Sequence, residues 1–168
     1  DGTSVMTEAG VRFAVDFAQG QKTGFYLDQR ANRTLAARLC AGRTMLNLFS
    51  YTGAFALRAA AAGATRVVSV DSSARAVQAA RANAALNPSL RADTLEWVQG
   101  DAVAYLRDPG PWDVVVVDPP PFARRRSEVE GALRGYTGLF HQALKAVSPG
   151  GFALLFSCSG AVDKPLFR

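Results

Sequence analysis

From Met45 onward, short apolar segments alternate with segments that carry a helical pattern. The apolar segments are rich in valine, leucine and phenylalanine, which favour strands, and alanine dominates several of the segments between them. This alternation is typical of consecutive β-α-β units, whose strands lie side by side in a parallel sheet. The sequence therefore predicts an α/β fold.

Five strands are expected, and the fourth is apolar on both faces (DVVVVD), which predicts a central position in the sheet. The strands are predicted at 45–50, 66–71, 95–99, 113–118 and 152–157, and helices at 34–41, 54–62, 102–107 and 128–147. A further helix is predicted after Ser72 or Ser73, either of which can cap it, and ends near Leu86. Gly135 and Gly138 are expected to interrupt the last helix, and a turn at 149–151 is expected to follow it.

The first 33 residues follow a different pattern. Apolar and polar side chains alternate over 11–17, directly after the turn sequence Glu8-Ala9-Gly10. We therefore expect one arm of an antiparallel hairpin beside the sheet. The chain is predicted to divide into a hairpin and linker segment, 1–33, and a cofactor-binding core, 34–168.

Length and composition narrow the class of protein further. With 168 residues, 49% of them hydrophobic, the chain is expected to bury the core of one globular domain. It has no apolar run near the ~18 residues that a membrane span requires and no signal-peptide pattern at the start, so a cytoplasmic protein with no membrane partner is expected. Two cysteines, Cys40 and Cys158, and one histidine, His141, cannot build a thiolate and imidazole zinc site, and no metal is expected.

The charge of the chain permits a polyanionic partner without requiring one. Lysine and arginine together number 19 against 14 acidic residues, which gives a net charge of +5. Arg124, Arg125 and Arg126 are consecutive. A solvated loop and a phosphate-contacting surface are equally compatible with that run alone.

Candidate site residues follow the ends of the predicted strands, where ligands bind in open parallel sheets. The first strand leads into the sequence NLFSYTG, and the others lead to Asp71, Asp101, Asp118 and Cys158. Three carboxylates and one thiol are thus expected along one edge of the sheet.

The spacing around Asp71 favours a nucleoside. Asp71 lies 18 residues after Gly53, close to the ~20-residue spacing at which a carboxylate accepts both ribose hydroxyls. Phe49 and Tyr51 stand where dinucleotide-binding folds have glycines, which disfavours a pyrophosphate and favours a phosphate-free nucleoside such as S-adenosylmethionine. The Asp101 carboxylate or the Ala102 amide could meet the adenine. Helix capping is the alternative role for Asp71 and for Asp101.

The sequence Asp118-Pro-Pro-Pro-Phe122 predicts a rigid carboxylate, because each proline fixes its own φ. Methyltransferases that act on amino groups use Asp/Asn-Pro-Pro-aromatic, and the aromatic residue comes one position later here, which disfavours that chemistry. Cys158 follows the fifth strand, and its place beside Asp118 favours a nucleophile over a packed core thiol. Cys40 lies in the first predicted helix and is expected to pack in the core.

Five ordered motifs resemble one known family along nearly the whole chain. They are GQKTGFYLDQR (20–30), NLFSYTG (47–53), DPPPF (118–122), RGY (134–136) and FSCSG (156–160). They resemble the bacterial 23S ribosomal RNA 5-methylcytosine methyltransferases that carry an N-terminal PUA domain. One departure is Pro121, at a position that is often basic in the family.

The resemblance implies a Rossmann-like class I fold that binds S-adenosylmethionine, with ribosomal RNA as partner. It implies catalysis by Cys158 and Asp118. The cofactor-binding residues are expected to be Phe49, Ser50, Tyr51, Thr52, Gly53, Asp71, Ser72, Asp101, Ala102 and Asp118. The RNA-binding residues are expected to be Lys22, Arg30, Arg124, Arg125 and Arg126. Members of the family have a PUA domain and two further strands, so we expect this chain to be a fragment that is truncated before the last two strands.

Two alternatives remain open at this point. A methyltransferase for a guanine nitrogen of ribosomal RNA would share the Asp-Pro-Pro-x-Phe step and leave Cys158 without a catalytic role. A non-catalytic RNA-binding remnant would use the fold only as a platform. An NAD-dependent oxidoreductase is disfavoured because the phosphate-loop glycines are missing, and the sequence does not predict an oligomeric state.

Overall fold

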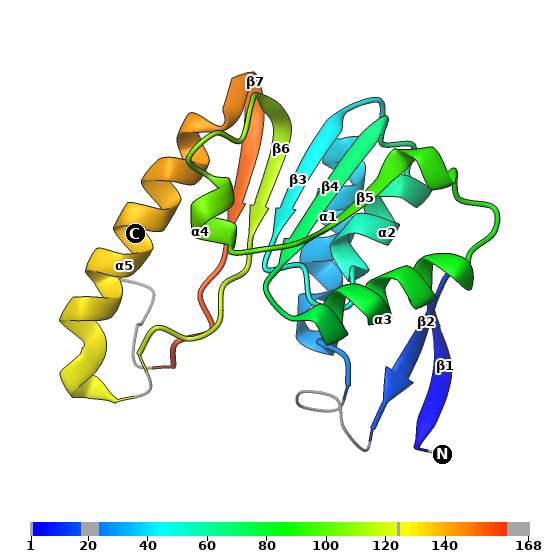
Figure 1. Cartoon of the computed structure of the whole chain (residues 1–168), viewed down its shortest axis with the longest axis horizontal. Helices are drawn as coiled ribbons and strands as arrows, with labels where there is room; N and C mark the ends of the chain where they lie inside the picture. The colour runs from blue at the N-terminus through cyan, green and yellow to red at the C-terminus, as the bar shows by residue number, and fades with distance from the viewer. Residues whose placement is uncertain (1, 18–23, 124, 161–168) are drawn as a thin grey trace.

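The computed structural model describes residues 2–17, 24–123 and 125–160, and it confirms the α/β fold and the antiparallel hairpin. Figure 1 shows a five-stranded parallel sheet, in the order β5-β4-β3-β6-β7, with the two-stranded hairpin β1-β2 below one end. The strands are β1 Thr3–Glu8, β2 Val11–Asp16, β3 Thr44–Leu48, β4 Arg66–Asp71, β5 Leu95–Gln99, β6 Trp112–Val117 and β7 Val147–Leu155. The α-helices are α1 Arg30–Cys40, α2 Ala54–Ala61, α3 Ala74–Ala85, α4 Ala102–Tyr105 and α5 Val129–Lys145, and the short 3-10 turns are η1 Leu27–Gln29, η2 Ala92–Thr94 and η3 Arg126–Glu128.

The strand that is apolar on both faces, β6, is an interior strand of the sheet, although β3 is the middle one. β6 lies between β3 and β7, and the side chains of Val114–Val117 are completely buried. Because β6 and β7 are parallel neighbours, with Val117 opposite Leu155, the segments that follow them leave the sheet at the same edge. In Figure 1 the arrowheads of β6 and β7 point to that shared edge.

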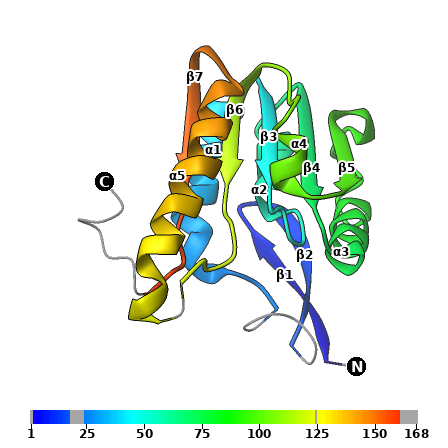
Figure 2. The same ribbon diagram turned by 60° about the vertical axis from the view of Figure 1, so that its left-hand side comes forward.

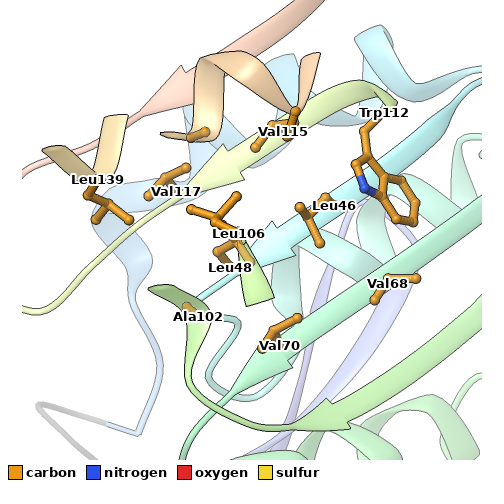
Figure 3. Packing of buried hydrophobic residues seen from close by; sticks show 12 residues of the cluster. Leu46, Leu48, Val68, Val70, Ala102, Leu106, Trp112, Val115, Val117 and Leu139 are labelled. Atoms are coloured by element: carbon orange, nitrogen blue, oxygen red, sulfur yellow. The ribbon is translucent and has the colours of Figure 1, made fainter. Parts of the chain in front are cut away.

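Two hydrophobic layers form because alternate residues of each strand face opposite sides of the sheet. On one side, Leu46 and Leu48 of β3 pack with α4 and α5 (Figure 3). On the other side, Met45 packs with α1 and α2, including Cys40. Figure 2 shows α5 and α1 on opposite sides of the sheet.

The hairpin is docked on the helical layer. Its turn is Ala9-Gly10, where both residues have positive φ, 46° and 82°, as a two-residue hairpin turn requires. Val11, Phe13 and Val15 alternate inward and are buried against Phe25 and Leu57. The predicted division of the chain at 33/34 stays a prediction.

The structure corrects three predicted boundaries and one predicted turn. Helix α1 begins at Arg30, four residues before the predicted start, and β3 ends at Leu48, two residues before the predicted end of the first strand. Strand β7 begins at Val147, and the predicted turn at 149–151 lies inside it as a bulge, since Val147 pairs with Trp112 and Phe152 with Val114.

The predicted interruption of the last helix is also wrong. Helix α5 is continuous through Gly135 and Gly138. A single glycine costs a helix only about 1 kcal/mol relative to alanine, and the buried face of α5 outweighs that cost.

Among the residues that the structure describes, no helix is long and apolar enough to cross a membrane.

Candidate functional site

The loop 49–53 leaves β3 in an unusual backbone conformation. Phe49 and Tyr51 have positive φ, 57° and 47°, which non-glycine residues seldom adopt. The Ser50 amide donates to the Val70 carbonyl at 3.1 Å, and the Gly53 amide donates to the Ser50 carbonyl at 2.9 Å. These bonds hold a tight turn at the carboxyl end of the sheet.

Gly53 closes this loop and precedes α2. Its φ is +80°, and a Cβ atom there would lie 2.6 Å from the Trp97 ring. Only glycine satisfies both conditions. The Asn83 side chain then donates to the carbonyl of the neighbouring Thr52 at 3.0 Å, so α3 also fixes the loop.

Asp71 is bound to this loop by its side chain. Its Oδ2 accepts from the Tyr51 amide at 2.7 Å, and its Oδ1 accepts from the Ser73 amide at 2.9 Å. Helix capping is carried by Ser73, whose hydroxyl accepts from the Ala76 amide. Asp71 is therefore not the cap of α3, and its carboxylate is half-buried beside the loop, next to the exposed Ser72.

Asp101, in contrast, caps a helix. Its Oδ1 accepts from the Ala104 amide at 2.6 Å at the start of the four-residue helix α4. The carboxylate is exposed, and the Ala102 side chain is buried in the core. The structure thus shows the capping role for Asp101, and a cofactor role for Asp101 and Ala102 stays a prediction.

Asp118 follows β6 and contacts the segment that precedes α1. The Gln29 side-chain amide donates to Asp118 Oδ2 at 3.0 Å, and the Asn32 side-chain amide donates to Gln29 Oε1 at 2.5 Å. The carboxylate at this strand end is thus held by a residue far away in the sequence.

Cys158 lies three residues beyond β7, with its side chain exposed. Its Sγ donates to the carbonyl of Pro119, the residue after Asp118, at 3.5 Å. The thiol and the Asp118 loop therefore meet at one edge of the sheet. Cys40 is completely buried, as predicted, and burial raises the pKa of its thiol to about 12.

Tyr26 joins these groups together. Its ring meets Tyr51 edge-on, with centroids 5.5 Å apart. Burial raises the pKa of the Tyr26 phenol, and the nearby Tyr51, Cys158 and Asp118 raise it further. The phenol stays protonated at neutral pH, so it is a hydrogen-bond donor placed among the loop 49–53, Asp118 and Cys158.

Comparison with known proteins identifies the family. Residues 2–165 match the family model described as S-adenosylmethionine-dependent methyltransferase. The chain belongs to this family. This methyltransferase is 46% identical over 168 residues to a protein of Shewanella frigidimarina named ribosomal RNA large subunit methyltransferase I. The match covers 98% of this chain and 42% of that protein. A protein of the same name from Serratia proteamaculans is 44% identical over 97% of this chain and 42% of its own length.

A solved methyltransferase has the same fold. Its crystal structure, in complex with SAH, superposes with a TM-score of 0.78 at 33% identity and covers 90% of this chain and 41% of that chain. The methyltransferase described here therefore spans less than half the length of these relatives.

The residues at the strand ends fit S-adenosylmethionine, the cofactor of the family. The Ser50 hydroxyl is buried at the start of the loop, and no described residue is its hydrogen-bond partner. The carboxylate of Asp71 accepts from the amide of the next residue, Tyr51, and the loop has no glycine-rich phosphate cradle. A buried hydroxyl, a carboxylate and two aromatic residues suit a nucleoside that carries no phosphate.

The predicted RNA-binding residues are only partly described. Lys22 and Arg124 lie outside the described residues. Arg125 and Arg126 are exposed at the start of η3, and the Arg125 amide donates to Glu128. Arg30 is exposed, although its Nε lies 3.4 Å from the buried Glu8 carboxylate.

Metal-binding clusters and surface hollows add nothing to this site. Among residues 2–17, 24–123 and 125–160, no three His, Cys, Asp or Glu side chains are grouped so that they could hold a metal ion. One hollow of about 680 Å³ lies between the hairpin turn and the segment 87–94, and another of about 590 Å³ lies between Phe122 and the start of α5. Asp71, Asp118 and Cys158 line neither hollow.

Sequence reasoning missed Tyr26 and Gln29. Both belong to the motif GQKTGFYLDQR, from which only the charged Lys22 and Arg30 were selected. The motif itself was the available signal, because its uncharged residues contact Tyr51 and Asp118.

Proposed function

We propose that this methyltransferase modifies carbon 5 of a cytosine in 23S ribosomal RNA through a covalent adduct with Cys158. The observation that carries the proposal is the exposed Cys158 thiol in contact with the backbone of the Asp118 loop. The names of the relatives support ribosomal RNA as the substrate, although this chain spans 42% of their length. A ribosomal RNA substrate implies a cytoplasmic location.

The cofactor-binding residues of the proposal are those around the loop 49–53. Ser50, Thr52 and the ring of Tyr51 would hold the nucleoside, and the Asp71 carboxylate would accept from the ribose hydroxyls. Phe49, Gly53, Ser72, Asp101 and Ala102 complete the proposed surface. S-adenosylmethionine supplies an electrophilic methyl group when it is bound.

Cys158 is the nucleophile because carbon 5 of cytosine is itself a poor one. A base first takes the proton of the thiol, and the thiolate forms a bond to carbon 6, which moves the π electrons of the ring toward carbon 5. Asp118 accepts hydrogen bonds at N3 and at the exocyclic amine and so favours the protonated, electrophilic ring. Carbon 5 would take the methyl group as the bond between that group and the sulfonium sulfur breaks, which leaves S-adenosylhomocysteine. A base then removes the carbon 5 proton, and the bond between carbon 6 and the Cys158 sulfur breaks as the ring double bond forms again.

The RNA must present its cytosine outside any helix, since the reacting carbons lie within the base stack of a duplex. Arginine side chains near the site would hold the phosphates on either side of the flipped base. Arg125 and Arg126 are exposed beside the DPPPF loop, and Lys22, Arg30 and Arg124 are the other residues proposed for this role.

The test is methylation of ribosomal RNA by the intact protein, with the modified base identified by mass spectrometry. Cys158→Ala is expected to abolish 5-methylcytosine formation and the stable adduct with RNA that contains 5-fluorocytosine. Cys40→Ala is the matched control, because Cys40 is buried away from the strand ends.

Two outcomes would contradict the proposal. If Cys158→Ala methylates RNA at the wild-type rate, the product is expected to be a guanine nitrogen, and the cytosine mechanism is wrong. If the wild type binds RNA but neither binds S-adenosylmethionine nor methylates any base, the protein is a non-catalytic RNA-binding module. S-adenosylmethionine binding that Asp71→Ala removes would exclude that module.

A further inference from the structure

We propose that Gln29 is a positioning residue that orients the Asp118 carboxylate for methyl transfer. The proposal rests on the role proposed above for Asp118. The Gln29 amide nitrogen lies 3.0 Å from Asp118 Oδ2, and 89 positions separate the two residues in the sequence. The bond restrains rotation of the carboxylate and thereby sets the direction in which its other oxygen points.

Asn32 determines which end of the Gln29 side chain faces Asp118. The amide nitrogen of Asn32 donates to Gln29 Oε1 at 2.5 Å. Since that oxygen can only accept and the nitrogen of the same amide can only donate, Gln29 presents a donor to the carboxylate. Asn32, Gln29 and Asp118 therefore form a chain of hydrogen bonds with one defined direction.

A buried ion pair fixes the backbone around Gln29. Arg33, on α1, donates to both oxygens of Glu8 at 2.8 and 2.7 Å and to the Tyr26 carbonyl at 2.8 Å. Arg33 and Glu8 are 1% and 5% exposed. Arg58 of α2 adds a bond to the Ala9 carbonyl at 3.0 Å. Gln29 is thus anchored through the core, which gives Asp118 a rigid partner.

The absence of a charge on Gln29 matters because other polar groups already surround the Asp118 carboxylate. Tyr26 lies near Asp118 and also near Cys158 and Tyr51. An amide donor favours the ionised carboxylate, whereas a second carboxylate at the same distance would oppose it, and one of the two would hold a proton. Gln29→Glu keeps the shape of the side chain and reverses this effect.

The experiment compares Gln29→Ala and Gln29→Glu with Gln78→Ala, an exposed glutamine of α3. In the intact protein, Gln29→Ala is expected to lower kcat for RNA methylation about tenfold or more, the effect expected of a hydrogen bond to a charged group, and to leave the Kd of S-adenosylmethionine unchanged. In Gln29→Glu, the acidic limb of the pH–rate profile is expected to move to higher pH. Gln78→Ala is expected to match the wild type in all three measurements.

A double-mutant cycle separates positioning from a general structural effect. If Gln29 acts through Asp118, Gln29→Ala adds no further loss in an Asp118→Asn background. Independent, additive losses would overturn the proposal. So would a Gln29→Ala protein with weakened S-adenosylmethionine binding and unchanged kcat, because Gln29 would then be a cofactor contact.

A measurement without catalysis keeps this result distinct from failure of the proposed function. NMR titration of the Asp118 carboxyl carbon is expected to show a higher pKa in Gln29→Glu than in the wild type. An unchanged pKa would overturn the proposal. If the protein methylates guanine, the cytosine mechanism is wrong, while the titration and the cycle still report whether Gln29 controls Asp118.

Discussion

The Tyr136 hydroxyl lies 2.7 Å from the hydroxyl of Ser159, the residue that follows Cys158. The same Ser159 hydroxyl accepts from the Ala123 amide at 3.2 Å. Phe122 stacks on Tyr136, with ring centroids 4.5 Å apart. Helix α5 therefore connects the loop after Asp118 to the loop that carries Cys158. Tyr136, which makes this connection, is buried, with 2% of its surface exposed.

Removal of the Tyr136 hydroxyl is expected to loosen this connection. Tyr136→Phe keeps the stack on Phe122 and takes one partner from the buried Ser159 hydroxyl, which costs about 1 kcal/mol of stability. We expect a several-fold lower rate of methyl transfer with the Kd of S-adenosylmethionine unchanged. The control is Tyr105→Phe on α4, and a wild-type rate in Tyr136→Phe would show that the bond does not position Cys158.

Two glycines of α5 are expected to respond oppositely to alanine. At Gly138 a Cβ meets no atom within 4 Å, so Gly138→Ala is expected to stabilise the protein by roughly 0.5–1 kcal/mol. At Gly135 a Cβ would lie 3.0 Å from the Phe122 ring. Gly135→Ala is expected to lose that gain and to slow catalysis by displacing the DPPPF loop. Chemical denaturation measures the stability of both variants, and equal stabilisation by Gly135→Ala and Gly138→Ala would contradict the packing argument.

Glu8 is expected to contribute a large part of the stability of the hairpin. Burial alone would raise the pKa of Glu8, but the hydrogen bonds and charge of Arg33, together with the charge of Arg58, lower it below the usual value. Glu8→Gln leaves a buried arginine without its counter-ion and is expected to cost about 3–5 kcal/mol. The control is Asp93→Asn, which removes the exposed ion pair of Asp93 with Arg91. Denaturation of this variant should show no measurable change in the free energy of unfolding.

The lowered pKa of Glu8 also sets the direction of the pH dependence. The stabilisation is fully present above the unfolded pKa, near 4.5, and is lost as the pH falls through the lower pKa of the folded state. The difference in stability between wild type and Glu8→Gln should therefore shrink in acid. A difference that stays constant from neutral pH to pH values well below 4.5 would contradict the ion-pair account.

Thiol alkylation is expected to distinguish the two cysteines. The Cys40 thiol is buried with a pKa of about 12, so it has almost no thiolate at neutral pH, whereas Cys158 is exposed. Iodoacetamide on the folded protein should give one adduct, at Cys158, by peptide mass spectrometry. Cys158→Ser should give none until denaturant is added, and labelling of Cys40 in the folded protein would contradict its burial.

Much of the candidate site could be predicted because parallel strands end at one edge of the sheet. The apolar run before Asp118 and the strand before Cys158 were sufficient to place both residues at that edge, and β6 and β7 are indeed neighbours. Asp71 was placed by the same rule and contacts the loop 49–53.

The contact between Gln29 and Asp118 could not be predicted in the same way. It depends on how the segment 24–29 crosses to the sheet, which the buried pair of Glu8 and Arg33 determines. Local propensity likewise favoured a break in α5 at Gly135, but the packing of Phe122 against that glycine supports a continuous helix. Tertiary contacts decided both cases.

The docking of the hairpin has a consequence for cooperativity. Asn83 Oδ1 accepts from the Ala14 amide while its nitrogen donates to the Thr52 carbonyl, and Asn87 bonds the amide and the carbonyl of Arg12. Two asparagines one helical turn apart thus complete the hydrogen bonding of β2 as a neighbouring strand would. Because Asn83 joins the hairpin to the loop 49–53, amide protons of both should exchange with solvent in a single opening event, and a ligand held by that loop should slow hydrogen exchange in the hairpin as well.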